Sequence, residues 1–489
     1  MKFAIYPPIN IARLGNSPTG FFIGAETQGS PGTEISDIGE ESPVSAFKDK
    51  NFRVKRQAAR FRIYEFNDDG SGGRPAILPS GTKVRWSVRL VNKKDAVVRS
   101  SGPPTHPTVP AQDPSRTDRV IDSGLREALP SQEVSLQGTY RGTPVYLGEV
   151  RLDPNGNLLV LGGRGVSNSL STPTLPAGAP IGNEVGGGGF YNNRDWHDDT
   201  SDGPVTASIE FPDGSSQNAA GAWVIVGPPD FARASQAIVT LYDVIFQTAY
   251  SQHWVTPAST PSFARDIQPL IARASSLRWA HADPTWGQIS TDWSTLSLPD
   301  ATTAALRKKT RDAILHAQNA FSQFRIQIWQ KEYLDKWVSG GFANDWPAGT
   351  PPAGDISPAS ITRVALDGTA GQGFFPGIEG GIILSDASLY LQPFKFRLDP
   401  AKVSPGDVTA LMALPWQADF LECNTGWWPS QRPDLAPQAD GTLVAWARPL
   451  DEQNDHRKLV AIAMQLGVVT PKIVSGQQVA VEELRDPSL

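Results

Sequence analysis

The chain has 489 residues and a formal net charge of -6 at pH 7, and 19% of its residues are charged. At about 150 residues per domain, this length indicates two or three domains. Because the net charge is negative and no basic patch dominates, we expect no nucleic acid partner. The single cysteine, Cys423, rules out an intramolecular disulfide and a cysteine-cluster metal site, and we expect no metal.

The N-terminal residues lack the features of a signal peptide. The first ten residues, MKFAIYPPIN, contain no long apolar run, and no cleavage site of small residues follows them. No stretch of about 18 apolar residues occurs in the chain, so we expect no membrane span. A cytoplasmic location is therefore expected, although non-standard secretion would leave no such mark.

Residues 1–250 are predicted to be rich in strands. Short β-prone runs are bounded by Gly, Pro, Asn or Asp, a pattern typical of a meander or sandwich. Asp153-Pro154-Asn155-Gly156 predicts a tight turn between two strands. The predicted strands are Phe3–Tyr6, Arg60–Phe66, Lys83–Val91, Val145–Leu152, Leu158–Leu161, Thr206–Phe211 and Ala222–Val226. Residues Ser100–Pro114 and 168–190 are predicted to be loops.

The second half of the chain shows helical periodicity from about residue 229. Helices are predicted at Ala237–Tyr250, Ala264–Ala274 (interrupted by Pro269), Asp300–Val338 and Gln453–Leu466, and a linker at Pro347–Pro358. The fold class is therefore predicted to be α+β, with a strand-rich N-terminal half and a mixed C-terminal half. The expected domains are residues 1–250 and 251–489.

The segment from Leu414 to Asp434, LPWQADFLECNTGWWPSQRPD, carries the densest chemistry. It places Cys423 within five residues of Trp427 and Trp428, and Asp419 four residues before Cys423. Residues four apart share a face of a helix, and also a face of a strand. From composition alone, an aromatic core stretch with one buried thiol is the simpler interpretation.

This segment resembles the core motif of the quinoprotein amino-acid oxidases related to L-lysine ε-oxidase and glycine oxidase. Those proteins carry P-W-Q-A-D-F-x-x-C followed by W-W-P-x-Q-R-P-D. The resemblance preserves its order along nearly the whole chain. Further similar segments are Ile11–Gly24, Lys55–Tyr64, Trp86–Lys94, Leu147–Gly163, Asp198–Thr206, Trp223–Phe231 and Phe374–Glu379.

The resemblance implies a cofactor made from the protein, cysteine tryptophylquinone, in which an oxidised tryptophan is joined to a cysteine by a thioether. Cys423 is the only possible cysteine. Trp446, in W-A-R, is the best match for the tryptophan, with Trp427 and Trp428 as alternatives; Pro449 stands where the family usually has glycine. Asp419 matches the aspartate needed for cofactor formation and could also act as a base in turnover. A helix cap or an arginine partner is its alternative role.

The implied activity is oxidation of a primary amine of an amino acid by O2, with release of a carbonyl product, ammonia and hydrogen peroxide. The resemblance also implies a flavoprotein maturation partner and a homo-oligomer. Two other interpretations stay open. One is an enzyme with the same cofactor that acts on a peptidyl or natural-product amine, and the other is a non-catalytic relative.

Substrate-pocket residues are expected from the same similar segments. His197 could equally lie in a solvent-facing loop, and His456 could lie at the surface. Arg432 could bind a substrate carboxylate in a bidentate manner, or it could instead form a structural salt bridge. The candidates are Phe231, Phe375, Glu379, His197, His456 and Arg432.

Overall fold

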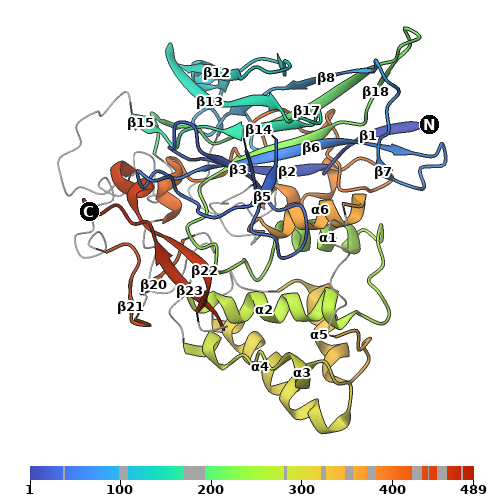
Figure 1. The fold of residues 1–489 in the computed structure, drawn as a ribbon, viewed down its shortest axis with the longest axis vertical. Coiled ribbons are helices and arrows are strands. Elements are labelled where there is room, and N and C mark those ends of the chain that lie inside the picture. The colour runs from blue at the N-terminus through green and yellow to red at the C-terminus, as the bar shows by residue number, and fades with distance from the viewer. Residues whose placement is uncertain are drawn as a thin grey trace.

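The computed structural model describes residues 1–36, 39–98, 108–169, 193–279, 284–320, 326–346, 356–371, 380, 382–420, 432–438, 440–448, 460–474 and 477–489. Figure 1 shows the strands of the N-terminal half at one end of the molecule and helices α2 to α5 at the other. A C-terminal hairpin, β22 and β23, lies to one side. The predicted α+β class, with its strand-rich first half, is confirmed.

Among the described residues, 17 strands are linked into one sheet. Its longest strand, β6 (Arg56–Phe66), pairs with β1, β2, β3, β7 and β14. Six of the seven predicted strands are present, and the seventh, Lys83–Val91, is broken at residues 89–90 into two strands. The strands of this sheet are β1 (Lys2–Tyr6), β2 (Ile9–Arg13), β3 (Phe21–Ile23), β4 (Thr33–Ile35), β5 (Glu41–Pro43), β6, β7 (Arg74–Pro75), β8 (Lys83–Val88), β9 (Val91–Asn92), β10 (Ile121–Asp122), β11 (Arg126–Glu127), β12 (Val134–Tyr140), β13 (Thr143–Leu152), β14 (Leu158–Gly162), β17 (Ser201–Glu210), β18 (Ser216–Asn218) and β19 (Ala222–Gly227).

Three further two-stranded sheets lie outside this sheet in the described part of the chain. The C-terminal hairpin was not predicted from the sequence, and its second strand, QQVAVEE, does not alternate apolar and polar residues. The pairs are β15 (Ser167–Ser169) with β16 (Trp196–Asp198), β20 (Leu435–Pro437) with β21 (Leu443–Ala445), and β22 (Val468–Val474) with β23 (Gln477–Glu483).

The described helices follow β19 in the chain. They are α1 (Leu241–Ser251), α2 (Gln268–Ser276), α3 (Trp293–Leu296), α4 (Ala304–Ala320), α5 (Ile328–Val338) and α6 (Pro358–Asp367), with a π-helical turn at Phe263–Ile267. Short 3-10 helices occur at Pro114–Arg119, Leu277–Trp279, Pro284–Gln288, Ala301–Thr303, Ile383–Ser385, Ala387–Leu389, Trp416–Phe420 and Ala463–Gln465. None of these helices is long and apolar enough to cross a membrane.

Two helix predictions need correction. The expected single helix Asp300–Val338 is two helices, because Gln327 is extended (φ -71°, ψ 159°) and forms a capping box with Gln330 at the start of α5. Pro269 does not interrupt a helix. It lies in the first turn of α2, directly after the π-helical turn Phe263–Ile267, so the chain stays helical on both sides of it.

Several predictions fall wholly or partly outside the described residues. They concern residues 100–107 of the first predicted loop, most of the second loop, the linker up to residue 355, and residues 453–459 of the last predicted helix. Of that helix, the described part has one short helical stretch and the 3-10 helix Ala463–Gln465.

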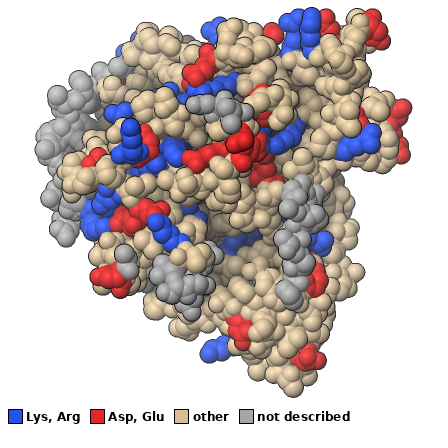
Figure 2. Space-filling model, in the orientation of Figure 1, with Lys and Arg blue, Asp and Glu red and all other residues tan. Residues whose placement is uncertain are grey.

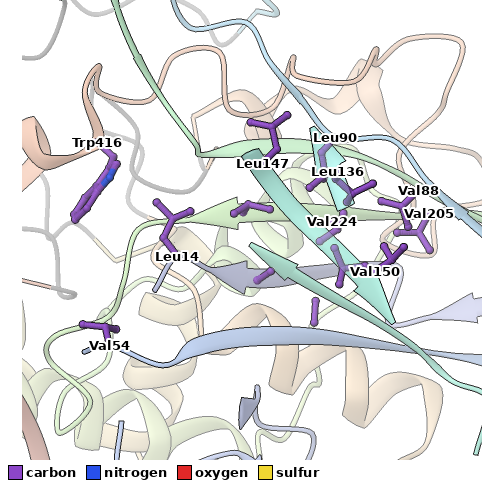
Figure 3. Packing of buried hydrophobic residues seen from close by; sticks show 14 of the residues in the cluster. Leu14, Val54, Val88, Leu90, Leu136, Leu147, Val150, Val205, Val224 and Trp416 are labelled. Atoms are coloured by element: carbon purple, nitrogen blue, oxygen red, sulfur yellow. The ribbon is translucent and has the colours of Figure 1, made fainter. Parts of the chain in front are cut away.

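The largest hydrophobic cluster joins the two halves of the chain. Strand residues such as Val88, Val150 and Val205 belong to it together with Trp416 (Figure 3). Trp446 belongs to the same cluster. Alternation along β17 produces this inward face, since Val205, Ala207 and Ile209 are buried while Thr206 is exposed. The domain division at residue 250 stays a prediction.

Candidate active site

The side chain of Trp446 is completely buried at the end of the β20–β21 hairpin. Its indole Nε1 donates a hydrogen bond to the Gly467 carbonyl oxygen at 2.8 Å, and its amide donates to the Asp434 carbonyl at 3.0 Å. Its own carbonyl accepts a hydrogen bond from Arg485. These contacts fix both the backbone and the rotation of the ring.

Aromatic rings connect Trp446 to the P-W-Q-A-D-F segment. The Phe231 ring lies 5.3 Å from the Trp446 ring, centroid to centroid, and meets the Phe420 ring edge-on at 5.8 Å. Phe420 in turn meets Trp416 edge-on at 5.5 Å. Trp416 and Phe420 are the first and last residues of one 3-10 turn, which also contains Asp419. Through Phe420, this turn is in direct contact with the Phe231 ring.

Arg432 is a charged group that lies close to the Trp446 ring. Its guanidinium carbon lies 5.5 Å from the ring centroid, and the side chain is about 1% exposed. Nε donates to the Phe420 carbonyl at 2.8 Å, while Asp434 lies 4.0 Å from Nη1. The guanidinium thus ties the 3-10 turn to the tryptophan, and its predicted contact with a substrate carboxylate stays a prediction.

His197 is not a solvent-facing loop residue. It belongs to β16, is buried, and stacks on the Tyr140 ring at 4.6 Å. Burial lowers the pKa of its imidazole, and Nδ1 has no hydrogen-bond partner among the described residues. Tyr140 donates to Asp95, whose pKa burial raises to about 6. No described contact brings His197 to Trp446, so its pocket role stays a prediction.

The other candidates lie outside what the structure describes. Asp419 is described by its backbone alone, as part of the 3-10 turn Trp416–Phe420. The remaining candidates outside the described residues are Cys423, Trp427, Trp428, Phe375, Glu379 and His456.

Asp199 and Lys48 are two buried ionisable residues to which the sequence motifs assign no role. Burial raises the pKa of the Asp199 carboxyl to about 7, against hydrogen bonds from the amides of Gly165 and Val166 that lower it. Burial also lowers the pKa of Lys48 to about 7. Asp199 directly follows Trp196-His197-Asp198 in the sequence, but no sequence pattern indicates that its side chain is buried.

Two family models match this chain, one in its N-terminal half and one in its C-terminal half. The L-lysine epsilon oxidase N-terminal model matches residues 6–226, and the L-lysine epsilon oxidase C-terminal domain model matches residues 316–439. The chain belongs to the L-lysine epsilon-oxidase family. It is therefore an oxidoreductase of the amino-acid oxidase class, and the expected enzyme class is confirmed.

Relatives of this family support the same assignment. L-lysine 6-oxidase of Marinomonas mediterranea is 24% identical over 542 residues, which cover 86% of this chain and 71% of the relative. The crystal structure of L-Lys epsilon-oxidase from that organism matches the fold with a TM-score of 0.75 at 20% identity, covering 99% of this chain and 95% of that one. A crystal structure of its Schiff base intermediate with L-Lys gives the same values.

In this member of the L-lysine epsilon-oxidase family, the C-terminal match includes Asp419 and Cys423 but ends at residue 439, before Trp446. The assignment of Trp446 rather than Trp427 or Trp428 therefore stays a prediction that depends on the resemblance of W-A-R, since Trp427 and Trp428 lie outside the described residues.

The family member also has a cleft of about 1010 Å³ between the sheet and helices α1, α2, α5 and α6. Figure 2 shows the hollow, with basic side chains inside it. Its ionic lining residues are paired with one another, as in Arg273 with Asp367 and Arg363 with Asp266. Asp230 and Arg233 border the cleft on either side of Phe231, but Trp446 is not among its described lining residues.

Proposed function

We propose that this chain is a quinoprotein oxidase that deaminates a primary amine of an amino acid. The overall reaction takes the amine, O2 and water to a carbonyl product, ammonia and hydrogen peroxide. The observation that carries the proposal is the environment of Trp446, whose ring is fully buried and lies close to both the Phe231 ring and the Arg432 guanidinium.

The proposed cofactor is cysteine tryptophylquinone formed from Trp446 and Cys423, and the described surroundings of Trp446 support it. An indole is the side chain that can become an indole quinone, and Cys423 is the only thiol of the chain. The hydrogen bond from Nε1 to Gly467 fixes the ring without using its benzene edge, where the quinone oxygens and the thioether would be. Once formed, this group would supply an electrophilic carbonyl carbon and an acceptor for two electrons.

The protein's own side chains would orient this group and stabilise it. Phe231 packs against the ring and would help to keep water away from it. The Arg432 cation favours an electron-rich ring, because a cation near an aromatic ring is attracted to its electrons. Asp419 would accept protons during cofactor formation and serve as the base in turnover. Phe375, Glu379, His197 and His456 are proposed to contribute to the substrate pocket.

The names of the relatives favour an amino acid as substrate, and we propose the same class here. A peptidyl or natural-product amine is the second candidate, and a non-catalytic relative is the third. A flavoprotein is proposed to mature the cofactor, and the active form is proposed to be a homo-oligomer in the cytoplasm.

Peptide mass spectrometry of the protein from its native host tests this proposal. We expect a peptide pair in which Cys423 is joined to an oxygenated Trp446, and we expect Cys423→Ser and Trp446→Phe each to abolish the link. A link to Trp427 or Trp428 would keep the activity class but contradict the assignment of Trp446. A free Cys423 with unmodified tryptophans would refute the quinoprotein proposal. Peroxide release from a panel of free amino acids and lysyl peptides would then identify the substrate class.

A further inference from the structure

The turn that carries Asp419 is held by a buried ion pair from the strand-rich half. Lys94 and Asp198 form this pair, and both side chains are completely buried. Lys94 Nζ also donates to the Ala413 carbonyl at 2.7 Å, and Asp198 Oδ2 accepts from the Trp416 amide at 2.8 Å. The pair thus holds backbone atoms on both sides of Leu414 and Pro415, immediately before the Trp416–Phe420 turn.

Asp198 is fixed on its other oxygen as well. Oδ1 accepts from Asn92 Nδ2 at 3.0 Å and from Thr200 Oγ1 at 2.9 Å. A carboxylate with both oxygens engaged by separate elements has little freedom to rotate. The position of the Trp416 amide is therefore set by β9 and by the chain after β16.

Two neighbouring contacts hold the same short segment. Asn193 donates to the Leu414 carbonyl from its backbone at 3.1 Å and from its side chain at 2.8 Å. Ser167 Oγ donates to Gln417 Oε1 at 2.7 Å. The strand-rich half therefore contacts Ala413, Leu414, Trp416 and Gln417, which precede Asp419.

We propose that Lys94 and Asp198 are positioning residues for cofactor formation, which set where the Trp416–Phe420 turn lies against Phe231 and Trp446. This inference rests on the proposed function. Burying an ion pair costs much of the attraction that it gains, so the pair is a weak source of stability. Its particular contribution is directional, because it holds one carbonyl and one amide at fixed places.

Cross-link yield per folded chain separates positioning from stability. Asp198→Asn keeps the size of the side chain but removes the charge that pairs with Lys94. We expect strongly reduced Cys423–Trp446 cross-linking, measured by peptide mass spectrometry and quinone absorbance, because a misplacement of about 1 Å can slow a reaction about 100-fold. Maturation is followed over time, below the melting temperature of every variant.

A matched control is the ion pair of Asp243 with Arg273, which is also buried but lies between α1 and α2. Asp243→Asn should lower the melting temperature as Asp198→Asn does and leave the cross-link yield per folded chain unchanged. Equal yields in Asp198→Asn and wild type would overturn the inference, as would equal losses in Asp198→Asn and Asp243→Asn.

A milder variant keeps the test decisive if Asp198→Asn fails to fold. Ser167→Ala removes one hydrogen bond to Gln417 from a partly exposed residue, and we expect slower cross-linking with an unchanged melting temperature. Wild-type maturation rates in Ser167→Ala would then refute the inference. Absence of any cross-link in the wild-type protein would instead refute the proposed function itself.

Discussion

The Phe231 ring packs against the Trp446 indole with centroids 5.3 Å apart and ring planes inclined at 51°. The backbone around Phe231 is fixed by β22, since the Val469 amide donates to the Phe231 carbonyl at 2.8 Å and the Ala234 amide donates back to Val469 at 3.0 Å. The segment after β19 that contains Phe231 is therefore held by the C-terminal hairpin next to the Trp446 ring, the candidate quinone.

Phe231→Leu should reduce turnover per quinone while leaving the protein folded. The smaller side chain leaves space beside the Trp446 ring and loses the aromatic contact, at a cost of about 1–3 kcal/mol in the free energy of unfolding. Peroxide release divided by quinone absorbance measures turnover, and urea unfolding measures stability.

Phe263→Leu is the matched control for this prediction. Phe263 is also fully buried and contacts another ring, that of Phe342 at 5.9 Å, but it belongs to the helical cluster. It should lose similar stability and keep normal turnover. Equal turnover losses in the two variants would show that Phe231 has only a packing role.

Local sequence signals predicted the strands because each signal acts within a few residues. At the turn that starts with Asp153, the Asp153 carboxylate accepts from the amides of Asn155 and Asn157, and Gly156 has the positive φ of 77° that glycine tolerates. The predicted turn therefore follows from nearby residues alone.

Tertiary contacts were not predictable in the same way. Lys94 and Asp198 are 104 residues apart, and both occur in segments that resemble the family, yet neither segment indicates that the two side chains meet. The burial of His197 depends on the Tyr140 ring from another strand. The break before α5 depends on Gln327, a residue with good intrinsic helix propensity, so composition favoured a continuous helix.

Arg432→Met should slow reduction of the quinone by substrate more than Arg432→Lys does. Both variants lose the planar group that donates from Nε to Phe420, but lysine keeps a positive charge near the Trp446 ring. We expect Arg432→Met to cost about 1–2 kcal/mol of ring stabilisation, or about tenfold in rate.

Stopped-flow absorbance at the quinone band measures this rate. Cross-link content determined by mass spectrometry corrects for incomplete maturation in each variant. Identical rates in the methionine and lysine variants would show that the charge of Arg432 does not act on the ring.

The Asp199 carboxyl should make the protein less stable as pH rises from about 4 to about 7. Its pKa is raised by burial from 3.8 to about 7 in the folded state, so the folded chain holds a proton that the unfolded chain releases in this range. Relative to Asp199→Asn, wild-type stability should therefore fall by about 1.4 kcal/mol per pH unit and be constant above about pH 7. Urea unfolding of both proteins across this range measures the difference, and parallel pH curves would contradict the prediction.

Lys48 should have the opposite pH dependence, with consequences for Trp446. Burial lowers the Lys48 pKa from 10.5 to about 7, so between these values the unfolded chain binds more protons and stability rises with pH. Relative to Lys48→Met, wild type should gain about 1.4 kcal/mol per pH unit above about pH 7. The neutral amine can still donate to the carbonyls of Leu466 and Leu484, at 2.7 and 3.0 Å.

Lys48→Arg provides the control, because a guanidinium stays protonated throughout this range and cannot gain stability in the same way. Since Leu466 precedes Gly467, the acceptor of the Trp446 indole N–H, loosening this segment should also raise the mobility of the candidate quinone ring. We therefore expect Lys48→Met to show lower turnover per quinone than wild type at about pH 9, where lysine is largely neutral in the folded protein. A Lys48→Met curve parallel to that of wild type would show that this side chain does not titrate on unfolding.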